Sequence, residues 1–257
     1  RPGALAGVKY FLVPNVKNFS WMTVVAAMGQ MFYSLSIAMG ILITFGSYMK
    51  KDTAIEDSTR NVEIFDTGIA IMAGLMIIPA VFAFSGGDPD TLQAGPSLMF
   101  ITIPKVFQNM GFGTVIGIVF FLLVLFAAVT SSIALTESAV STFEDELGWG
   151  RKKATVLVGV IMLALGSLSS LGYGPLAGIK IIGMQFLDLF DFLTNSVMMP
   201  IAALLTSLFV SRVVGIDKIE AEIIHGESAF RRKKVFVVMI KYLCPVFAII
   251  ILLSSVA

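Results

Sequence analysis

The chain has 257 residues, of which 57% are hydrophobic and only 14% are charged, and its mean hydropathy is +0.91. Soluble domains are about 45–50% apolar and about 25% charged, so this chain could not cover a water-exposed surface, and we predict a membrane protein. Its net charge of +1, single cysteine and single histidine exclude a basic nucleic-acid surface, an internal disulfide and a cysteine–histidine zinc cluster.

Charge-free apolar runs mark the candidate membrane-spanning helices. A hydrocarbon core of about 30 Å needs roughly 20 apolar residues as a helix, and the alternating pattern of a transmembrane barrel is not found in the sequence. Six runs qualify, namely residues 18–49, 67–87, 106–136, 154–179, 192–211 and 242–257, the last of which begins nearer to Val235. We therefore predict an all-α integral membrane protein with six transmembrane helices in one membrane domain, residues 1–257.

The connections between these runs differ in their content of lysine and arginine. Most of the basic side chains lie in residues 50–66, 137–153 and 212–234, and basic connections face the cytoplasm. The first run is therefore expected to cross from outside to inside, with residues 1–20 external and residues 212–234 forming a cytoplasmic connection. The sequence starts with Arg1 and shows no signal-peptide pattern, so we expect an internal piece of a longer protein.

One external connection, residues 85–113, is unlike the others. It contains the turn-forming residues 86–90 and then the apolar stretch 98–104, which is too short to span a membrane and ends in proline. We predict a re-entrant or capping hairpin over an external vestibule. An ordinary pair of surface helices is the alternative, although long loops are commonly functional or disordered.

Small and polar residues interrupt the first apolar run. Gln30, Ser34 and Ser36 lie between Gly29 and Gly40, and each glycine costs up to about 1 kcal/mol relative to alanine in a helix. A helix that breaks here would free amides and carbonyls to bind an ion or a carboxylate. The alternative is that these residues only allow straight helices to pack closely.

Hydroxyl and acidic residues also occur where they are costly. Thr130, Ser131 and Ser132 follow one turn after the carbonyl of Ala127, and such oxygen donors suit a sodium ion. The alternative is bonding to the preceding turn or to neighbouring helices.

Three acids, Asp66, Glu137 and Asp191, lie at or inside apolar runs. An acid costs about 2.5–3.5 kcal/mol at the bilayer centre but little at the interface, so these three mark either a transport pathway or a helix end.

Several strings, in the same order, resemble the neurotransmitter:sodium symporter family, particularly its bacterial sodium-coupled amino-acid transporters. Residues 29–36 are similar to the unwound sixth helix, residues 94–104 to the fourth extracellular loop, and residues 130–132 and 144–147 to the eighth helix and its cytoplasmic end. The resemblance implies the second half of a LeuT-like inverted-repeat transporter with a helix unwound near Ser34 and Ser36, preceded by a first repeat that this chain lacks.

The resemblance also implies a substrate site, two sodium sites and two gates. The substrate site would use Tyr33, Ser34, Ser36, Met39, Ser131 and Leu135. The first sodium site would use Ser34 and Asp66, and the second would use Ala127, Thr130 and Ser131. The outer gate would include Gln30 and Asp191, and the inner gate Tyr48 and Asp145. Each sodium site is expected to be completed by the first helix of the absent repeat.

The implied function is sodium-coupled symport of a hydrophobic or aromatic L-amino acid by alternating access, without enzyme chemistry. Met39 replaces a phenylalanine of some relatives, and the flexible methionine suits a broad apolar substrate. Many members carry asparagine at the position of Asp66, and chloride-dependent animal members carry serine at that of Ala70. A fixed carboxylate beside the first sodium ion would replace the charge of chloride, so we expect chloride independence.

The expected partners are the amino-acid substrate, the lipid bilayer and the N-terminal half of the same protein, with no nucleic acid. Two other functions remain as alternatives on this fold: an amino-acid-binding sensor and a channel-like protein. An intramembrane enzyme is disfavoured, because the only histidine, His225, is far from Ser131 in sequence.

Overall fold

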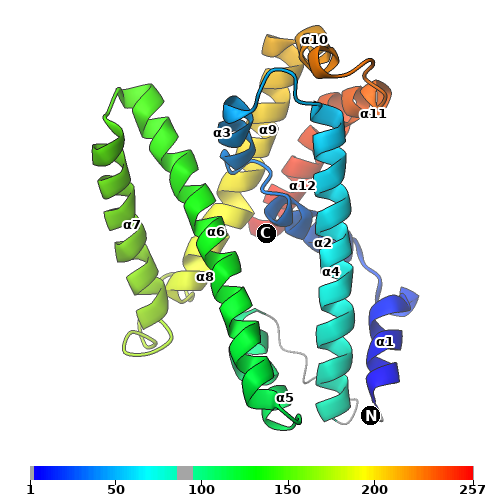
Figure 1. Cartoon of the computed structure of the whole chain (residues 1–257), viewed down its shortest axis with the longest axis vertical. Helices are drawn as coiled ribbons and strands as arrows, with labels where there is room; N and C mark the ends of the chain where they lie inside the picture. The colour runs from blue at the N-terminus through cyan, green and yellow to red at the C-terminus, as the bar shows by residue number, and fades with distance from the viewer. Residues whose placement is uncertain (1–2, 86–94, 257) are drawn as a thin grey trace. The chain divides into compact units, whose positions relative to one another are not determined.

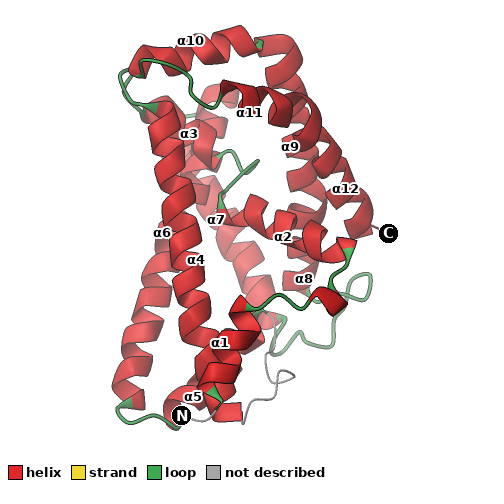
Figure 2. Cartoon of the chain, turned by 90° about the vertical axis from the view of Figure 1, so that its right-hand side faces the viewer, coloured by secondary structure: helices red, strands yellow, loops and turns green. Residues whose placement is uncertain are grey.

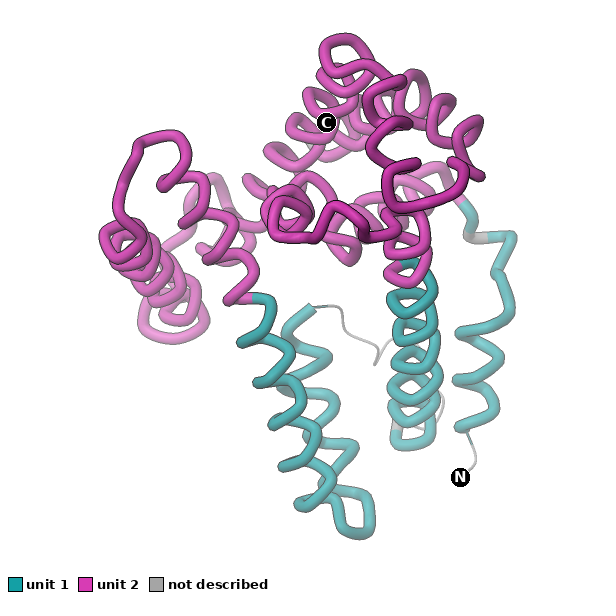
Figure 3. Tube along the Cα trace, turned by 45° about the horizontal axis from the view of Figure 1, so that its top comes forward, with its two compact units in different colours: residues 1–19, 63–131 teal, residues 20–62, 132–257 magenta. Residues whose placement is uncertain are grey.

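The computed structural model describes residues 3–85 and 95–256. Within these ranges the chain consists of helices joined by loops, with no β-strand (Figure 2). It divides into two compact units (Figure 3): unit 1 contains residues 1–19 and 63–131, and unit 2 contains residues 20–62 and 132–257. The helices α4 (Ile55–Ser85) and α6 (Gly113–Leu147) each begin in one unit and end in the other.

Five helices of the described chain are long and apolar enough to cross a membrane. They are Ile55–Phe84, Gly113–Leu147, Arg151–Leu171, Phe186–Val214 and Lys233–Ser255. Each overlaps one of the predicted spans, which confirms the all-α membrane fold. Their ends differ from the charge-free runs because charged side chains at a helix end reach water without interrupting the backbone.

The remaining predicted span, residues 18–49, is two short helices. These are α2 (Trp21–Ser34) and α3 (Ile41–Tyr48). A capping box starts α2, since the Ser20 side chain accepts from the backbone of Thr23 and the Ser20 N–H donates to the Thr23 hydroxyl over 3.4 Å.

In unit 1, α1 (Ala4–Leu12) packs on the second half of α4. Gly7 allows the close approach, because a Cβ there would lie 2.7 Å from the Cα of Pro79. The rings of Tyr10 and Phe82 are 5.1 Å apart, and Phe82 is only 3% exposed. A glycine and an aromatic pair thus fix α1 along α4 (Figure 1).

The segment predicted to form an external hairpin is helical in its described part. The helices η3 (Leu98–Thr102) and α5 (Ile103–Gln108) precede α6, and the Phe107 ring lies 5.4 Å from that of Phe120 on α6. The predicted third span therefore begins at Gly113 and not at residue 106, because α5 is a separate helix. The predicted turn at residues 86–90 lies outside the described residues.

Unit 2 contains the last two spans of the chain, which pack against each other. The span Phe186–Val214 consists of α8 (Phe186–Asp191), η4 (Phe192–Met198), α9 (Met199–Phe209) and η5 (Val210–Val214). After α10 (Ile216–Gly226), the last span consists of α11 (Lys233–Val238), η6 (Met239–Leu243) and α12 (Cys244–Val256). Helices α9 and α12 run side by side (Figure 1), and α12 also contacts α2.

A small buried cluster joins the end of α6 to α7 (Arg151–Leu171). Val140 of α6 and Ala154 of α7 are 1% and 0% exposed. Next to them the rings of Phe143 and Trp149 stack at 5.6 Å, and the Lys153 ammonium lies 3.8 Å from the centre of the Trp149 ring. These contacts hold the tight turn between α6 and α7.

A carboxylate from the connection after α10 caps the start of α4. Glu227 accepts from the N–H groups of Glu56 and Asp57, over 2.6 and 3.3 Å. The Arg231 N–H in turn donates to the Glu56 carboxylate over 2.9 Å. An anion at a helix N-terminus is favourable because it meets unpaired amides and the positive end of the helix dipole.

Replacing Glu227 by glutamine should therefore destabilise the protein. We expect a loss of about 1 kcal/mol in the free energy of unfolding, because the charge at the helix N-terminus is removed. Thermal unfolding of the purified protein in detergent measures this loss. Glu222→Gln, which removes an exposed carboxylate from α10, is the matched control, and equal melting temperatures of the two variants would contradict the capping role.

Candidate functional site

The predicted break in the first span is confirmed. Helix α2 ends at Ser34, α3 begins at Ile41, and between them Ser36, Ala38 and Gly40 have φ values of 54°, 64° and 77°. Residues other than glycine rarely adopt such values, so a regular helix cannot continue through this segment. We refer to residues 35–40 as the break.

Backbone groups of the break are left without partners. The last bonds that continue α2 run from the Leu35 N–H to the Met31 carbonyl (3.1 Å) and from the Ile37 N–H to the Phe32 carbonyl (2.9 Å). Within residues 3–85 and 95–256, the N–H groups of residues 38–40 donate to no backbone carbonyl. Residues 38–40 are half-buried, and amides that are removed from water need partners, so these groups are available to bind a ligand.

The second half of α6 holds the break and α3 in place. The Ser138 hydroxyl lies 3.4 Å from the Met39 carbonyl, to which it donates, and the hydroxyls of Thr44 and Ser141 are 3.2 Å apart. Ser138 and Thr44 are buried. A Cβ on Gly40 would lie 2.7 Å from the Ser138 oxygen, so glycine is favoured there both by its φ and by the space available.

Five of the predicted substrate residues lie in unit 2, around the break and on α6. Ser36 and Met39 are half-buried, whereas Tyr33, Ser34 and Leu135 are exposed. Leu135 precedes Ser138 by one turn of α6, so it lies on the same side of that helix as the contact with Met39. The sixth residue, Ser131, belongs to unit 1.

The predicted sodium residues other than Ser34 lie in unit 1. The Thr130 hydroxyl donates to the Ala127 carbonyl over 2.9 Å, and Ser131 follows on the same helix. A bond to the preceding turn is what the alternative to a sodium site predicts. Both oxygens nevertheless keep lone pairs, so the pair can still coordinate a cation. Asp66 is half-buried and lies about three turns inside α4, away from the helix end.

The outer-gate residues lie in unit 2. Gln30 is exposed on α2, and Asp191 is exposed at the end of α8. The Asp191 carboxylate accepts from the side-chain amide of Asn195, one turn later.

Of the inner-gate pair, Tyr48 makes a contact that the sequence did not predict. Its hydroxyl donates to the Glu137 carboxylate over 2.7 Å, while Asp145 is exposed on α6. The other oxygen of Glu137 lies 2.6 Å from the Arg151 guanidinium, which also binds Glu144 over 3.2 Å. Tyr48, Glu137, Glu144 and Arg151 form a cluster, which we term the tyrosine–glutamate–arginine cluster, that connects α3, α6 and α7.

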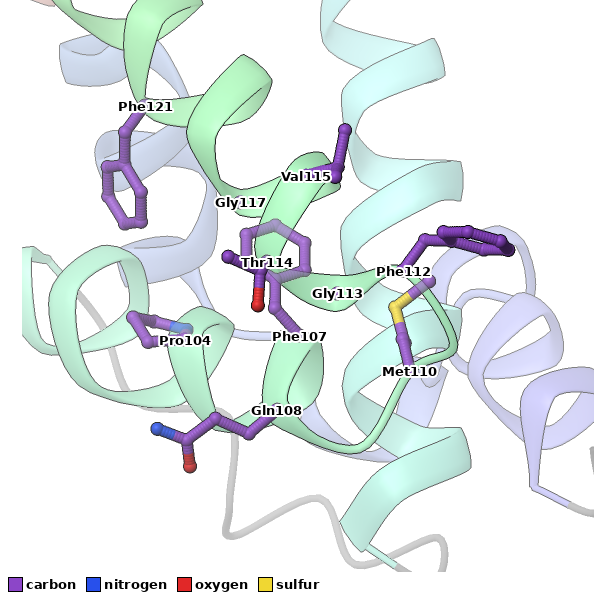
Figure 4. A pocket seen from close by; sticks show the side chains of 10 residues that line it. All are labelled: Pro104, Phe107, Gln108, Met110, Phe112, Gly113, Thr114, Val115, Gly117 and Phe121. Carbon is purple, nitrogen blue, oxygen red and sulfur yellow. The ribbon is translucent and has the colours of Figure 1, made fainter.

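A pocket in unit 1 contains none of the predicted site residues. It has a volume of about 420 Å³ and lies between α5 and the first turns of α6 (Figure 4). Phe107 points between these elements, and Phe112, with a φ of 59°, is 86% exposed at the turn. The remaining lining residues are Pro104, Gln108, Met110, Gly113, Thr114, Val115, Gly117 and Phe121.

Comparison with known proteins identifies related sequences along the whole chain. The sequence profile of the sodium:neurotransmitter symporter family matches residues 1–257. The uncharacterised sodium-dependent transporter YhdH of Bacillus subtilis is 32% identical over 253 residues, which are 98% of this chain and 55% of that protein. An uncharacterised sodium-dependent transporter of Haemophilus influenzae is 30% identical over 256 residues, which are 99% of this chain and 54% of that protein.

A solved structure is also similar to this chain. The crystal structure of MhsT in complex with L-phenylalanine superposes with a TM-score of 0.84 at 34% sequence identity. The similarity covers 98% of this chain and 56% of that chain. The chain therefore spans about half the length of the relatives it matches.

Proposed function

The chain belongs to the sodium:neurotransmitter symporter family, and from this membership we propose that it is the second half of a sodium-coupled amino-acid transporter. It is a multi-pass membrane protein, since five of its helices are long and apolar enough to span a bilayer. Residues 1–20 would lie outside the cell and residues 212–234 inside, as the distribution of lysine and arginine indicates.

The observation that carries this proposal is the break. A helix interrupted within the membrane presents unpaired amides and carbonyls, which can bind the carboxylate and the ammonium of an amino acid and the cation that accompanies it. The amides of residues 38–40 donate to no backbone carbonyl of the described chain. A purely structural helix would leave no such groups unpaired in a bilayer.

We propose a hydrophobic or aromatic L-amino acid as the substrate. Tyr33, Met39 and Leu135 offer apolar surface next to the break, and no charged residue is among the proposed substrate contacts. The relative MhsT was crystallised with L-phenylalanine. Ser34, Ser36 and Ser131 would contribute polar contacts.

Two sodium ions would be transported with the amino acid. The first would bind Ser34, Asp66 and the substrate carboxylate, and the second would bind the Ala127 carbonyl and the hydroxyls of Thr130 and Ser131. Both sites would be completed by the first helix of the first repeat. The Asp66 carboxylate would supply the negative charge that makes chloride unnecessary.

The tyrosine–glutamate–arginine cluster supports an inner gate. It connects α3, which directly follows the break, to α6 and α7. The Arg151 side chain is 59% exposed, and ion pairs with such exposure contribute only about 0–1 kcal/mol. A contact of this strength can close the inner side and still separate in every transport cycle. Asp145 would take part through a basic residue of the first half.

Uptake of labelled L-phenylalanine into proteoliposomes containing the full-length protein tests this function. With a sodium gradient directed inward, we expect accumulation above the external concentration, and no accumulation when potassium replaces sodium. Replacing chloride by gluconate should leave uptake unchanged. Binding without accumulation would favour the sensor, and accumulation that ignores sodium would contradict the proposal.

A further inference from the structure

A second pocket lies within unit 2, behind the break. Its volume is about 230 Å³, and its walls come from the last part of α2, the break, the start of α3, α9, η6 and α12. The break contributes Ser36, Ala38 and Gly40, which are its three residues with positive φ. Ala203 of α9 and the half-buried Cys244 of α12 also line it. No residue of α6 lines the pocket, so it reaches the break from a different side than Ser138 does.

The walls of this pocket suit an uncharged apolar molecule. Hydroxyl side chains occur among its lining residues only at Ser36, Thr206 and Ser207, and no charged side chain lines it. The Ser207 hydroxyl already donates to the Leu204 carbonyl over 2.8 Å. A cavity of about 150 Å³ with apolar walls stays dry and binds benzene. A pocket of about 230 Å³ therefore has room for one substituted aromatic ring.

An occupant of this pocket would touch a strained part of the backbone. Ser36 and Ala38 hold φ values that are unfavourable for residues with side chains, and such backbone persists only when its surroundings hold it. A molecule that fits the pocket in one conformation of the break shifts the population toward that conformation.

We propose that this pocket is a separate binding site for a small uncharged aromatic molecule, which restrains the break without being transported. The binding part of the proposal does not depend on the proposed substrate or ions. The restraint rests on the proposed transport function, because the break would have to change its conformation during the cycle.

The thiol of Cys244 reports on the pocket directly. Benzyl methanethiosulfonate transfers a benzylthio group to the thiol and releases methanesulfinate. With the full-length protein in lipid nanodiscs, mass spectrometry of the peptide that contains Cys244 follows this reaction. We divide each rate by the rate of the same reagent with free cysteine. We then expect benzylthio transfer to be at least about ten times faster than transfer from the charged trimethylammonium-ethyl reagent, because a charge is costly in an apolar pocket. Toluene should slow the benzyl reaction several-fold.

Three variants separate the pocket from the surrounding lipid. Val246→Cys combined with Cys244→Ser places a thiol on the exposed face of α12, where toluene should not slow the reaction. Ala203→Phe fills the pocket and should remove the effect of toluene. Leu205→Phe adds bulk on the exposed side of α9 and should preserve it. Ala203→Leu serves in place of Ala203→Phe if the larger variant does not fold.

The outcome decides both parts of the proposal. Absence of reaction at Cys244, equal rates for the two reagents, or equal effects of toluene on the exposed and pocket thiols would overturn the binding site. If uptake occurs in the unmodified protein, complete benzylthiolation of Cys244 should lower the maximal rate of uptake, and the Cys244→Ser variant should be insensitive to the reagent. An unchanged rate of uptake after complete benzylthiolation would overturn the restraint.

Discussion

Gly40→Ala should reduce sodium-driven uptake about tenfold, whereas Gly29→Ala should leave it near the wild-type rate. Gly40 has a φ of 77°, where a residue with a side chain pays about 1–2 kcal/mol. The new methyl group would also lie 2.7 Å from the Ser138 oxygen. Free energies of this size change an equilibrium by a factor of roughly 5–30. Because the break is proposed to hold the substrate, its displacement should reduce transport.

Gly29 provides the matched control on the same predicted span. It lies in α2, and a Cβ there would meet no atom within 4 Å. Alanine is also favoured over glycine inside a helix. Adding Ser138→Ala to Gly40→Ala removes the close contact with the Ser138 oxygen but keeps the backbone strain at residue 40. Uptake by the double variant therefore shows how much of the loss comes from each cause. Equal uptake by the Gly40→Ala and Gly29→Ala variants would show that the break does not require glycine.

The break was predictable from its sequence, but its geometry was not. Glycines and serines inside an apolar run predict either a broken helix or close packing. The resemblance of residues 29–36 to an unwound helix of the family favours the broken helix. In the structure the unusual φ values occur at Ser36 and Ala38 as well as at Gly40. Nothing in the identity of an alanine signals a left-handed conformation, because that conformation is held by the contacts of α6 and not by local preference.

Contacts between distant residues were the least predictable part of the site. In the sequence Glu137 is an acid in an apolar helix, whereas its partner Arg151 is one of several basic residues in a connection, and no local pattern pairs the two. The pair forms because the chain turns sharply at Gly148, whose φ is 62°. Likewise, Glu227 caps α4 from 171 residues away, which no local pattern encodes.

The limits of the helices were predictable only where a charge coincided with a helix end. The last span does begin near Val235, at Lys233. The third begins later than expected, because α5 packs its phenylalanine against α6 as a separate helix. Hydropathy measures apolar content along the chain, and it cannot distinguish a spanning helix from an apolar helix that lies beside one.

Asp66→Asn should lower uptake in any medium by at least about a hundredfold, and adding Ala70→Ser should restore uptake only when chloride is present. At an effective dielectric constant of about 20, a charge 4 Å from an ion contributes about 4 kcal/mol, and each 1.4 kcal/mol corresponds to about a tenfold change in affinity. Losing the carboxylate should therefore greatly weaken the first sodium site. Ala70 lies one turn after Asp66 on α4, so a serine there would face the same region and could bind chloride.

Uptake in chloride and in gluconate, as a function of sodium concentration, distinguishes the possible results. Asp52→Asn is the control, since it exchanges an exposed acid for an amide in the turn before α4. The wild-type protein and this control should ignore chloride, whereas the double variant should require it. If the Asp66→Asn variant keeps its uptake in gluconate, uptake needs neither the Asp66 carboxylate nor chloride. The Asp66 carboxylate is then not the charge that replaces chloride.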